Sequence, residues 1–150
     1  TILTTYTKIV VMPHLRLSVP ITGVTLTVSA SGNIKVIAGR ATSFICVTSG
    51  GLPAASIRWY KDTGNPGTTD ATILTGATSA VTTVNGLQVT TSTLVYTPTI
   101  QDDSKRIYCV ANNTDDVFTS NQPVLDVRVS SIKLIDGYME IRVRYILYIY

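Results

Sequence analysis

The chain has 150 residues, 45% of them hydrophobic and only 14% charged, with a formal net charge of +3. This length and composition suit one folded domain and exclude a disordered chain. Residues 20–130 carry seven basic and seven acidic side chains, so the positive surplus lies in the two ends and provides no basic face for nucleic acid. No stretch reaches the roughly 18–20 apolar residues of a membrane span.

Strand patterns recur at short spacing, and no segment reads as a helix. The expected strands, each alternating or bounded by turn residues, are 24–30, 33–39, 41–47, 56–62, 91–97, 105–111 and 123–129. Two weaker edge strands are expected at 71–74 and 80–84. Turn pairs such as Asn85-Gly86 and Asn112-Asn113 separate the runs. The pattern predicts an all-β sandwich of two antiparallel sheets.

The two ends differ from this pattern. We interpret residues 1–20, which stop at Pro20, as a linker or the end of a preceding domain. In residues 131–150, Asp136-Gly137 lies between apolar runs and favours a hairpin. The alternatives to a hairpin are that this β-rich tail is the start of a following segment, or that it has no stable structure on its own. Because the N-terminus lacks signal-peptide features, we expect a piece of a longer protein.

The two cysteines, Cys46 and Cys109, restrict the chemistry that the chain can perform. Together with the only histidine, His14, they are too few for a tetrahedral zinc site. A Cys–His nucleophile pair would also need His14, which lies in the expected linker. No carboxylate pair or activated lysine is recognisable, so we expect a binding module and no enzyme, metal or cofactor.

Two acidic pairs, Asp102-Asp103 and Asp115-Asp116, suggest calcium ligands at first sight. They fall on loops at opposite ends of the sixth expected strand, so they cannot share one ion. We interpret them as turn formers, with Asp103 bonding a local backbone amide.

The order of Cys46, Trp59 and Cys109 resembles that of immunoglobulin domains. Trp59 lies 13 positions after Cys46, and Cys109 lies 63 positions after it. Three stretches, "AGRATSFICVTSGGLPAASIRWYKD", "STLVYTPTIQDDSKRIYCVANN" and "SNQPVLDVRV", resemble C2-type domains of cell-adhesion and receptor ectodomains. The resemblance covers residues 21–130 and implies an immunoglobulin-like Greek-key sandwich.

The resemblance also implies a Cys46–Cys109 disulfide, with a muscle-type domain holding reduced thiols as the alternative. The residues expected to pack around the sulfur atoms are Trp59, Phe44, Ile57, Leu94, Ile107, Leu125 and Val127. The motif before the second cysteine departs from the family at two positions. Lys105 replaces its glycine and Ile107 its tyrosine, and residues 62–101 lack the arginine that often pairs with Asp103.

Strand alternation identifies a candidate binding face. With Trp59 and Cys109 inward, Arg58, Tyr60, Arg106, Tyr108 and Arg128 point outward from the third, sixth and seventh strands, around Asp126. The opposite sheet should present a rival apolar patch of Ile45, Val47 and Val95. The alternative for the arginines is that they form surface ion pairs of little energetic value.

Asn112-Asn113-Thr114 is a sequon for N-glycosylation, expected in a turn after the sixth strand. The resemblance as a whole implies an extracellular domain of a cell-surface or secreted adhesion or recognition protein, with another protein as partner. The alternatives are a structural spacer in a larger ectodomain, including that of a receptor enzyme, and a secreted immune-recognition molecule.

Overall fold

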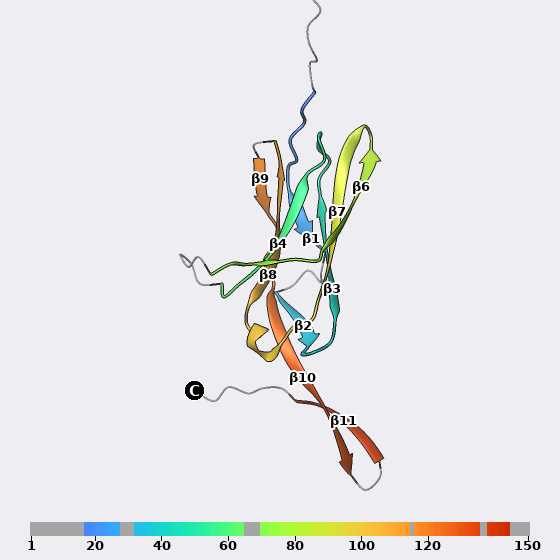
Figure 1. The fold of residues 1–150 in the computed structure, drawn as a ribbon, viewed down its shortest axis with the longest axis vertical. Helices are drawn as coiled ribbons and strands as arrows, with labels where there is room; N and C mark the ends of the chain where they lie inside the picture. Colours follow the sequence, from blue (N-terminus) through green and yellow to red (C-terminus); the bar gives the residue numbers. More distant parts are fainter. Residues whose placement is uncertain (1–16, 28–31, 65–69, 115, 136–137, 145–150) are drawn as a thin grey trace, which may run out of the picture.

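The computed structural model of the chain describes residues 17–27, 32–64, 70–114, 116–135 and 138–144. Within these ranges the chain forms two β-sheets packed face to face (Figure 1). This is the all-β sandwich that the alternating pattern predicts. Four features considered above, namely His14, the end of the first expected strand, Asp115 and the Asp136-Gly137 turn, lie outside the described residues.

The first sheet has four strands in the order β1-β3-β7-β6, and every neighbouring pair is antiparallel. The strands are β1 (Val24–Leu26), β3 (Thr42–Thr48), β7 (Leu87–Tyr96) and β6 (Thr78–Val84). A two-residue turn at Asn85 and Gly86, with φ of 50° and 80°, joins β6 to β7. Both residues have the positive φ that a type I′ hairpin requires, as the Asn-Gly pair predicts.

The second sheet follows the order β11-β10-β8-β4-β5, with β2 paired to β10 and β9 to β8. Its strands are β11 (Tyr138–Arg144), β10 (Val124–Ile135), β8 (Arg106–Asn113), β4 (Ser56–Asp62), β5 (Thr72–Leu74), β2 (Asn33–Ile37) and β9 (Asp116–Thr119). One pair departs from the expected antiparallel arrangement, because β2 runs parallel to β10. This happens because the chain crosses from the first sheet to the second between β1 and β2.

Three local expectations also need correction. A 3₁₀ helix, η1 (Ile100–Asp102), precedes β8 where no helix was expected. Asn112 and Asn113 belong to β8 itself, and Asn113 pairs with Asp116 of β9, so the turn follows them. An additional strand, β9, lies between β8 and β10, and β10 contains the seventh expected strand. β8 is long enough to pair with both β9 and the start of β10.

Packing and pairing extend beyond both proposed domain limits. Val19 forms a backbone bridge with Leu52, and Ile21 is buried in the core. At the other limit, β10 continues to Ile135 and pairs with β11 in register Ile135↔Tyr138. All pairs of β10 with β2 lie before residue 129, so a domain that ends at residue 130 keeps them. The limits of 21 and 130 stay a prediction.

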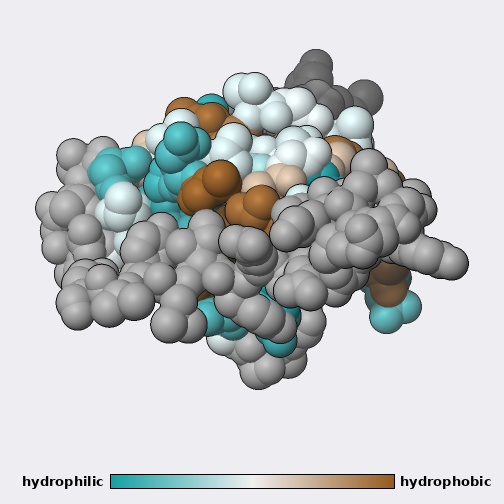
Figure 2. Space-filling model, turned by 90° about the horizontal axis from the view of Figure 1, so that it is seen from below, coloured by the Kyte–Doolittle hydropathy of each residue, from teal (hydrophilic) through white to brown (hydrophobic). Residues whose placement is uncertain are grey.

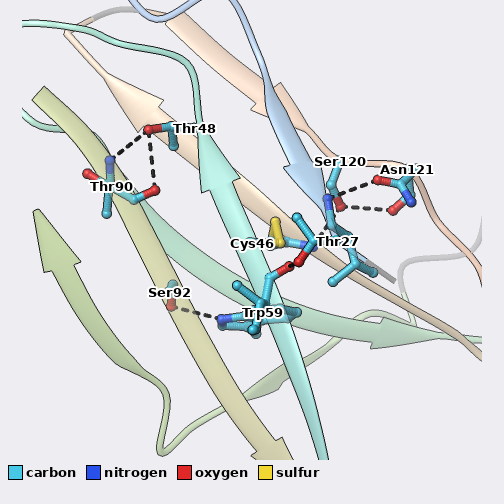
Figure 3. Close-up of a disulfide and its surroundings, with 11 residues drawn as sticks. Thr27, Cys46, Thr48, Trp59, Thr90, Ser92, Ser120 and Asn121 are labelled. Atoms are coloured by element: carbon cyan, nitrogen blue, oxygen red, sulfur yellow. Dashed lines mark hydrogen bonds between the residues drawn. A yellow bond between two sulfur atoms is a disulfide. The ribbon is translucent and has the colours of Figure 1, made fainter. Parts of the chain in front are cut away.

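The core lies between the sheets and centres on a disulfide bond between Cys46 of β3 and Cys109 of β8. Trp59 is 1% exposed, and its Nε1 donates a hydrogen bond to Ser92 Oγ of β7 at 3.0 Å (Figure 3). The bond satisfies the one polar atom of the indole, so the ring is buried at little cost. The other buried side chains include Phe44, Leu94, Ile107, Leu125 and Val127.

The exterior carries apolar side chains in small groups. Viewed from the end at which β10 leaves the sandwich, the described apolar residues form separate patches between polar ones (Figure 2). Small separate patches need no special explanation on a folded domain. Candidate sites must therefore be identified from specific contacts.

Candidate functional site

The outward side of β4 and β8 carries the candidate binding face. These strands are antiparallel neighbours in the register Trp59↔Cys109, so the adjacent Tyr60 and Tyr108 lie directly opposite each other on the outer side. Two further outward pairs flank the tyrosines. We call the six residues the tyrosine face: Arg58, Tyr60, Asp62, Arg106, Tyr108 and Val110.

Tyr60 and Tyr108 form a stacked pair in the middle of this face. Their ring centroids are 5.6 Å apart and their planes are inclined by 16°. Burial raises the pKa of Tyr108, and the negative charge of Asp62 raises it further. Both rings are half-buried, so each supports the other and leaves one flat surface toward solvent.

The guanidinium of Arg106 is held by Asp62 in a two-point contact. Nε donates to Oδ1 at 2.8 Å, and the second nitrogen donates to Oδ2 at 3.1 Å. The bond to Asp62 raises the pKa of Arg106. Asp62 could not be assigned to the face from the sequence, because its pairing depends on the register Asp62↔Arg106 across two strands. Fork-to-carboxylate geometry fixes the orientation of the arginine.

The prediction that the arginines gather around Asp126 is wrong. Among the described residues, Arg128 alone forms an ion pair with Asp126, at 3.1 Å on the same strand. β10 pairs with β8 at Val124↔Arg106, and residues 124–128 of β10 pair with β2 on the other side of the strand. Four residues along a strand span roughly 13 Å, so Arg128 lies away from the tyrosine face.

Arg58 and Asn112 border a shallow hollow at the other end of the face. The hollow measures about 160 Å³ and is lined by Arg58, Tyr60, Val110, Asn112 and Val117. Arg58 is exposed and forms no ion pair with any described residue. The Oδ1 atom of Asn112 accepts a hydrogen bond from the hydroxyl of Ser56. The hollow thus combines an available positive charge with a lining that is part polar and part apolar.

A buried polar cluster joins the two sheets near η1. Asp102 is 2% exposed and accepts bonds from Lys61 Nζ at 2.5 Å, from the Tyr96 hydroxyl at 2.7 Å and from the Thr99 backbone N–H at 2.8 Å. Lys61 also donates to the Tyr96 hydroxyl at 2.8 Å. Because these residues come from β4, β7 and η1, the cluster links both sheets.

The electrostatics of the cluster oppose catalysis. Burial alone would raise the pKa of Asp102, but the bonds from Lys61, Thr99 and Tyr96 outweigh it and hold that pKa well below its usual range. Burial alone would lower the pKa of Lys61, but its bonds to Asp102 and Tyr96 leave that pKa raised. A nucleophilic lysine needs a lowered pKa. The cluster is therefore suited to holding the fold together.

Sequence reasoning missed this cluster, although one signal was present. Lys61 follows Trp59 by two positions, and alternation places it on the same inward side. The interpretation of Asp102 as a turn former was incomplete, since its carboxylate is buried. The expected local bond of Asp103 is also wrong, because its Oδ1 accepts from the N–H of Val127 in β10 at 2.9 Å.

Comparison with known proteins identifies the family. Residues 24–119 match the model of the CD80-like C2-set immunoglobulin domain, a span of more than half of the chain. The chain belongs to the C2-set immunoglobulin family. No curated protein matches the sequence. The matched span of this C2-set domain includes the disulfide, Trp59 and the whole tyrosine face.

Solved structures resemble this immunoglobulin domain in fold. The Rst D1-D2 structure is 25% identical with a TM-score of 0.60, and the match covers 73% of this chain and 50% of that chain. The full ectodomain (Ig1-Ig3) of mouse nectin-like molecule 4 is 22% identical with a TM-score of 0.53, covering 75% of this chain and 35% of that chain. The chain thus spans half the length of the first and about a third of the second.

In this C2-set domain, the Lys61–Asp102 pair lies directly beside Asp103, for which residues 62–101 provide no arginine partner. Lys61 of β4 reaches the carboxylate next to Asp103, and Lys105 approaches the same carboxylate at 3.7 Å. The immunoglobulin domain therefore has a buried ion pair that joins β4 to η1.

The opposite sheet carries the rival apolar residues in scattered form. Val95 is 61% exposed and Ile45 37% exposed, while Val47 is half-buried. Ile45 lies opposite Thr93, and Val95 lies opposite Ser43. Polar neighbours separate the apolar side chains, so this side provides less continuous contact than the stacked tyrosines.

Two other features are absent from the described residues. No group of three or more His, Cys, Asp or Glu side chains in the described ranges is arranged to hold a metal ion. No helix within them is long and apolar enough to cross a membrane.

Proposed function

We propose that this chain is an extracellular immunoglobulin domain that binds another protein through the tyrosine face. The observation that carries the proposal is the stacked Tyr60–Tyr108 pair between Arg58 and the Arg106–Asp62 pair. Tyrosine and arginine are the residues most enriched in interface hot spots, because each combines large area with a polar group.

The geometry of the face supports tight contact at low entropic cost. Stacking and half-burial restrict the two tyrosine rings, and Asp62 fixes the guanidinium of Arg106. A partner would therefore immobilise few additional side-chain rotations on this side. Arg58 has no carboxylate partner among the described residues, so it favours a partner with an acidic group opposite the hollow.

An extracellular location is supported by the disulfide, since such bonds persist in oxidising compartments. Fold similarity to an ectodomain supports the same inference. We infer a place in a larger cell-surface or secreted protein of adhesion or recognition. A spacer domain without a partner of its own is the second candidate.

Reversing the charge of Arg58 tests the binding face. The Arg58→Glu variant should abolish binding of the tetramerised chain to partner-bearing cells and any self-association that uses this face. Stability should change little, because Arg58 is exposed and has no described ion pair. The matched control, Arg40→Glu, reverses an exposed charge in the β2–β3 loop and should bind like wild type.

A second variant removes the tyrosines. Tyr60→Ser with Tyr108→Ser should abolish binding, and loss of the stacked pair should lower the free energy of unfolding by about 1 kcal/mol. Changing Ile45 and Val95 to serine on the opposite sheet should leave binding intact. Binding that survives both the arginine and the tyrosine changes, or wild-type chain that binds no cell type and no copy of itself, favours the spacer function.

We also propose that Asn112 is glycosylated when the chain passes through a secretory pathway. Its side chain is exposed on β8, while the neighbouring Asn113 is buried and bonds to the backbone of Ile21. A glycan at Asn112 would start at the border of the hollow, at the Ser56 end of the tyrosine face. Intact mass of secreted chain should fall to the peptide mass in Asn112→Gln. An unchanged peptide mass in wild type would contradict the proposal.

A further inference from the structure

Strand β6 ends the first sheet and is exposed along its whole length. All seven residues from Thr78 to Val84 are exposed, and Figure 1 shows β6 on the outer side of β7. Among the described residues, no backbone hydrogen bond joins β6 to any element other than β7. One side of the strand therefore presents unpaired N–H and C=O groups to solvent.

The chemistry of β6 lacks the features that normally protect an open edge. Its sequence, TSAVTTV, contains no charge and no proline. The register with β7 runs without interruption from Thr78↔Thr93 to Val84↔Leu87, so no bulge bends the strand. Natural sheets usually shield edges with lysine, proline, bulges or short strands, because an open edge is a template for another strand.

The other outer strands of the domain do carry such protection. β1 and β5 have three residues each. β2 contains Lys35, β9 begins with Asp116, and β11 contains Glu140 and two arginines. The long uncharged edge is thus a property of β6 and not of the domain as a whole.

Hairpin geometry identifies the backbone groups that are open. The pair Val84↔Leu87 closes a two-residue turn and exchanges both of its hydrogen bonds. Alternation then directs the N–H and C=O groups of Val84 and of every second residue before it toward β7. The N–H and C=O groups of the residues between them point outward. The outward set consists of Ser79, Val81 and Thr83.

We propose that β6 pairs antiparallel with β6 of a second copy of this chain, about a two-fold axis at Val81. In this register Val81 lies opposite Val81 of the second copy, and Ser79 lies opposite Thr83. Each of these residues has its N–H and C=O free on the outer edge, so each opposed pair can exchange two hydrogen bonds. No other centre of symmetry within β6 pairs the whole outward set.

Side chains across this contact are compatible. Val81 is 49% exposed, and the axis would pack it against its own copy. Ser79 and Thr83 bring hydroxyl groups together, and no like charges meet, because β6 carries none. An isologous contact of this kind closes on itself as a dimer.

The contact uses the first sheet and leaves the tyrosine face, on the second sheet, uncovered. It does not depend on the proposed function. A dimer joined at β6 would present two tyrosine faces, and two linked sites bind a multivalent partner more tightly than one.

Sedimentation velocity of the 150-residue chain over a concentration series tests the proposal. We expect a monomer–dimer equilibrium that Val81→Pro shifts to monomer. Proline removes the N–H at the axis, and β7 does not use that group, so the melting temperature should stay close to wild type. Arg58→Glu should leave this dimer intact, which separates it from association through the tyrosine face.

Cysteine cross-linking checks the register even if the proline variant folds poorly. Val81→Cys places two sulfur atoms on residues with Cα atoms about 5.5 Å apart, within the range for a disulfide. Mild oxidation should give a covalent dimer of this variant, whereas the neighbouring Ala80→Cys should give none. A wild-type chain that is monomeric throughout, a dimer lost in Arg58→Glu, or equal cross-linking of both cysteine variants would overturn the proposal.

Discussion

Replacing both Cys46 and Cys109 by alanine is expected to lower the free energy of unfolding by about 4 kcal/mol. The bond closes a loop of 63 residues and so restricts the unfolded chain. Both residues are fully buried against Trp59, and the smaller alanines add a packing loss. Guanidinium unfolding followed by tryptophan fluorescence measures the effect, since Trp59 is the only tryptophan.

Wild-type chain unfolded in the presence of a reductant is the matched control for this change. Its thiols keep the volume of the core and lose only the covalent link, so the difference between reduced wild type and the double variant reports packing alone. A destabilisation below about 1 kcal/mol in both samples would contradict the loop-closure argument. Alkylation of oxidised, unfolded chain without reductant should add no mass.

Asp102→Asn is expected to lower the free energy of unfolding by about 3 kcal/mol at neutral pH. The change leaves the ammonium of Lys61, whose side chain is only 16% exposed, without its anionic partner. The amide can still accept from Tyr96 or Thr99, which keeps the effect near the lower end for a broken buried ion pair. Asp103→Asn is the matched control, because its amide oxygen can still accept from Val127.

The destabilisation by Asp102→Asn should depend on pH. The folded pKa of Asp102 lies below its usual value of 3.8, which the unfolded chain retains. Stability from the ionised carboxylate is therefore complete above about pH 5 and declines as the pH falls below about 4 toward the folded pKa. Unfolding at pH 7 and at pH 3 should show a smaller difference in the free energy of unfolding between wild type and variant in acid. A difference that is the same at both values would rule out the ion pair as its cause.

Local pattern was sufficient wherever one residue and its strand neighbours decide the outcome. A period of two places Trp59 and Cys109 inward and Tyr60 and Tyr108 outward, whatever lies beside them. The Asn85-Gly86 turn was equally predictable, because few other residues tolerate its positive φ at both positions. Cysteine and tryptophan spacing added the family and thus the disulfide.

Register across strands decided the rest of the candidate site. Arg106 pairs with Asp62, which is 44 positions away, and the sequence offered Asp126 as an equally reasonable partner. β8 pairs with β10 at Val124↔Arg106, and Arg128 lies four residues farther along β10, which separates Arg128 from the tyrosine face. Such choices depend on the register between neighbouring strands, and the register follows from the packing of the whole sandwich.

By itself, the sequence determined the all-β class, the inward or outward direction of each strand residue in the central strands, and the disulfide-bonded family. Only the tertiary structure decided that Lys61, Tyr96 and Asp102 meet in one buried cluster, and that β6 has an open edge along all seven residues. The physical reason is the distance along the sequence over which each effect acts. Alternation and turn preference act between neighbours in the chain, whereas the partner of a charge and the exposure of an edge are set by segments that are distant in sequence and adjacent only after folding.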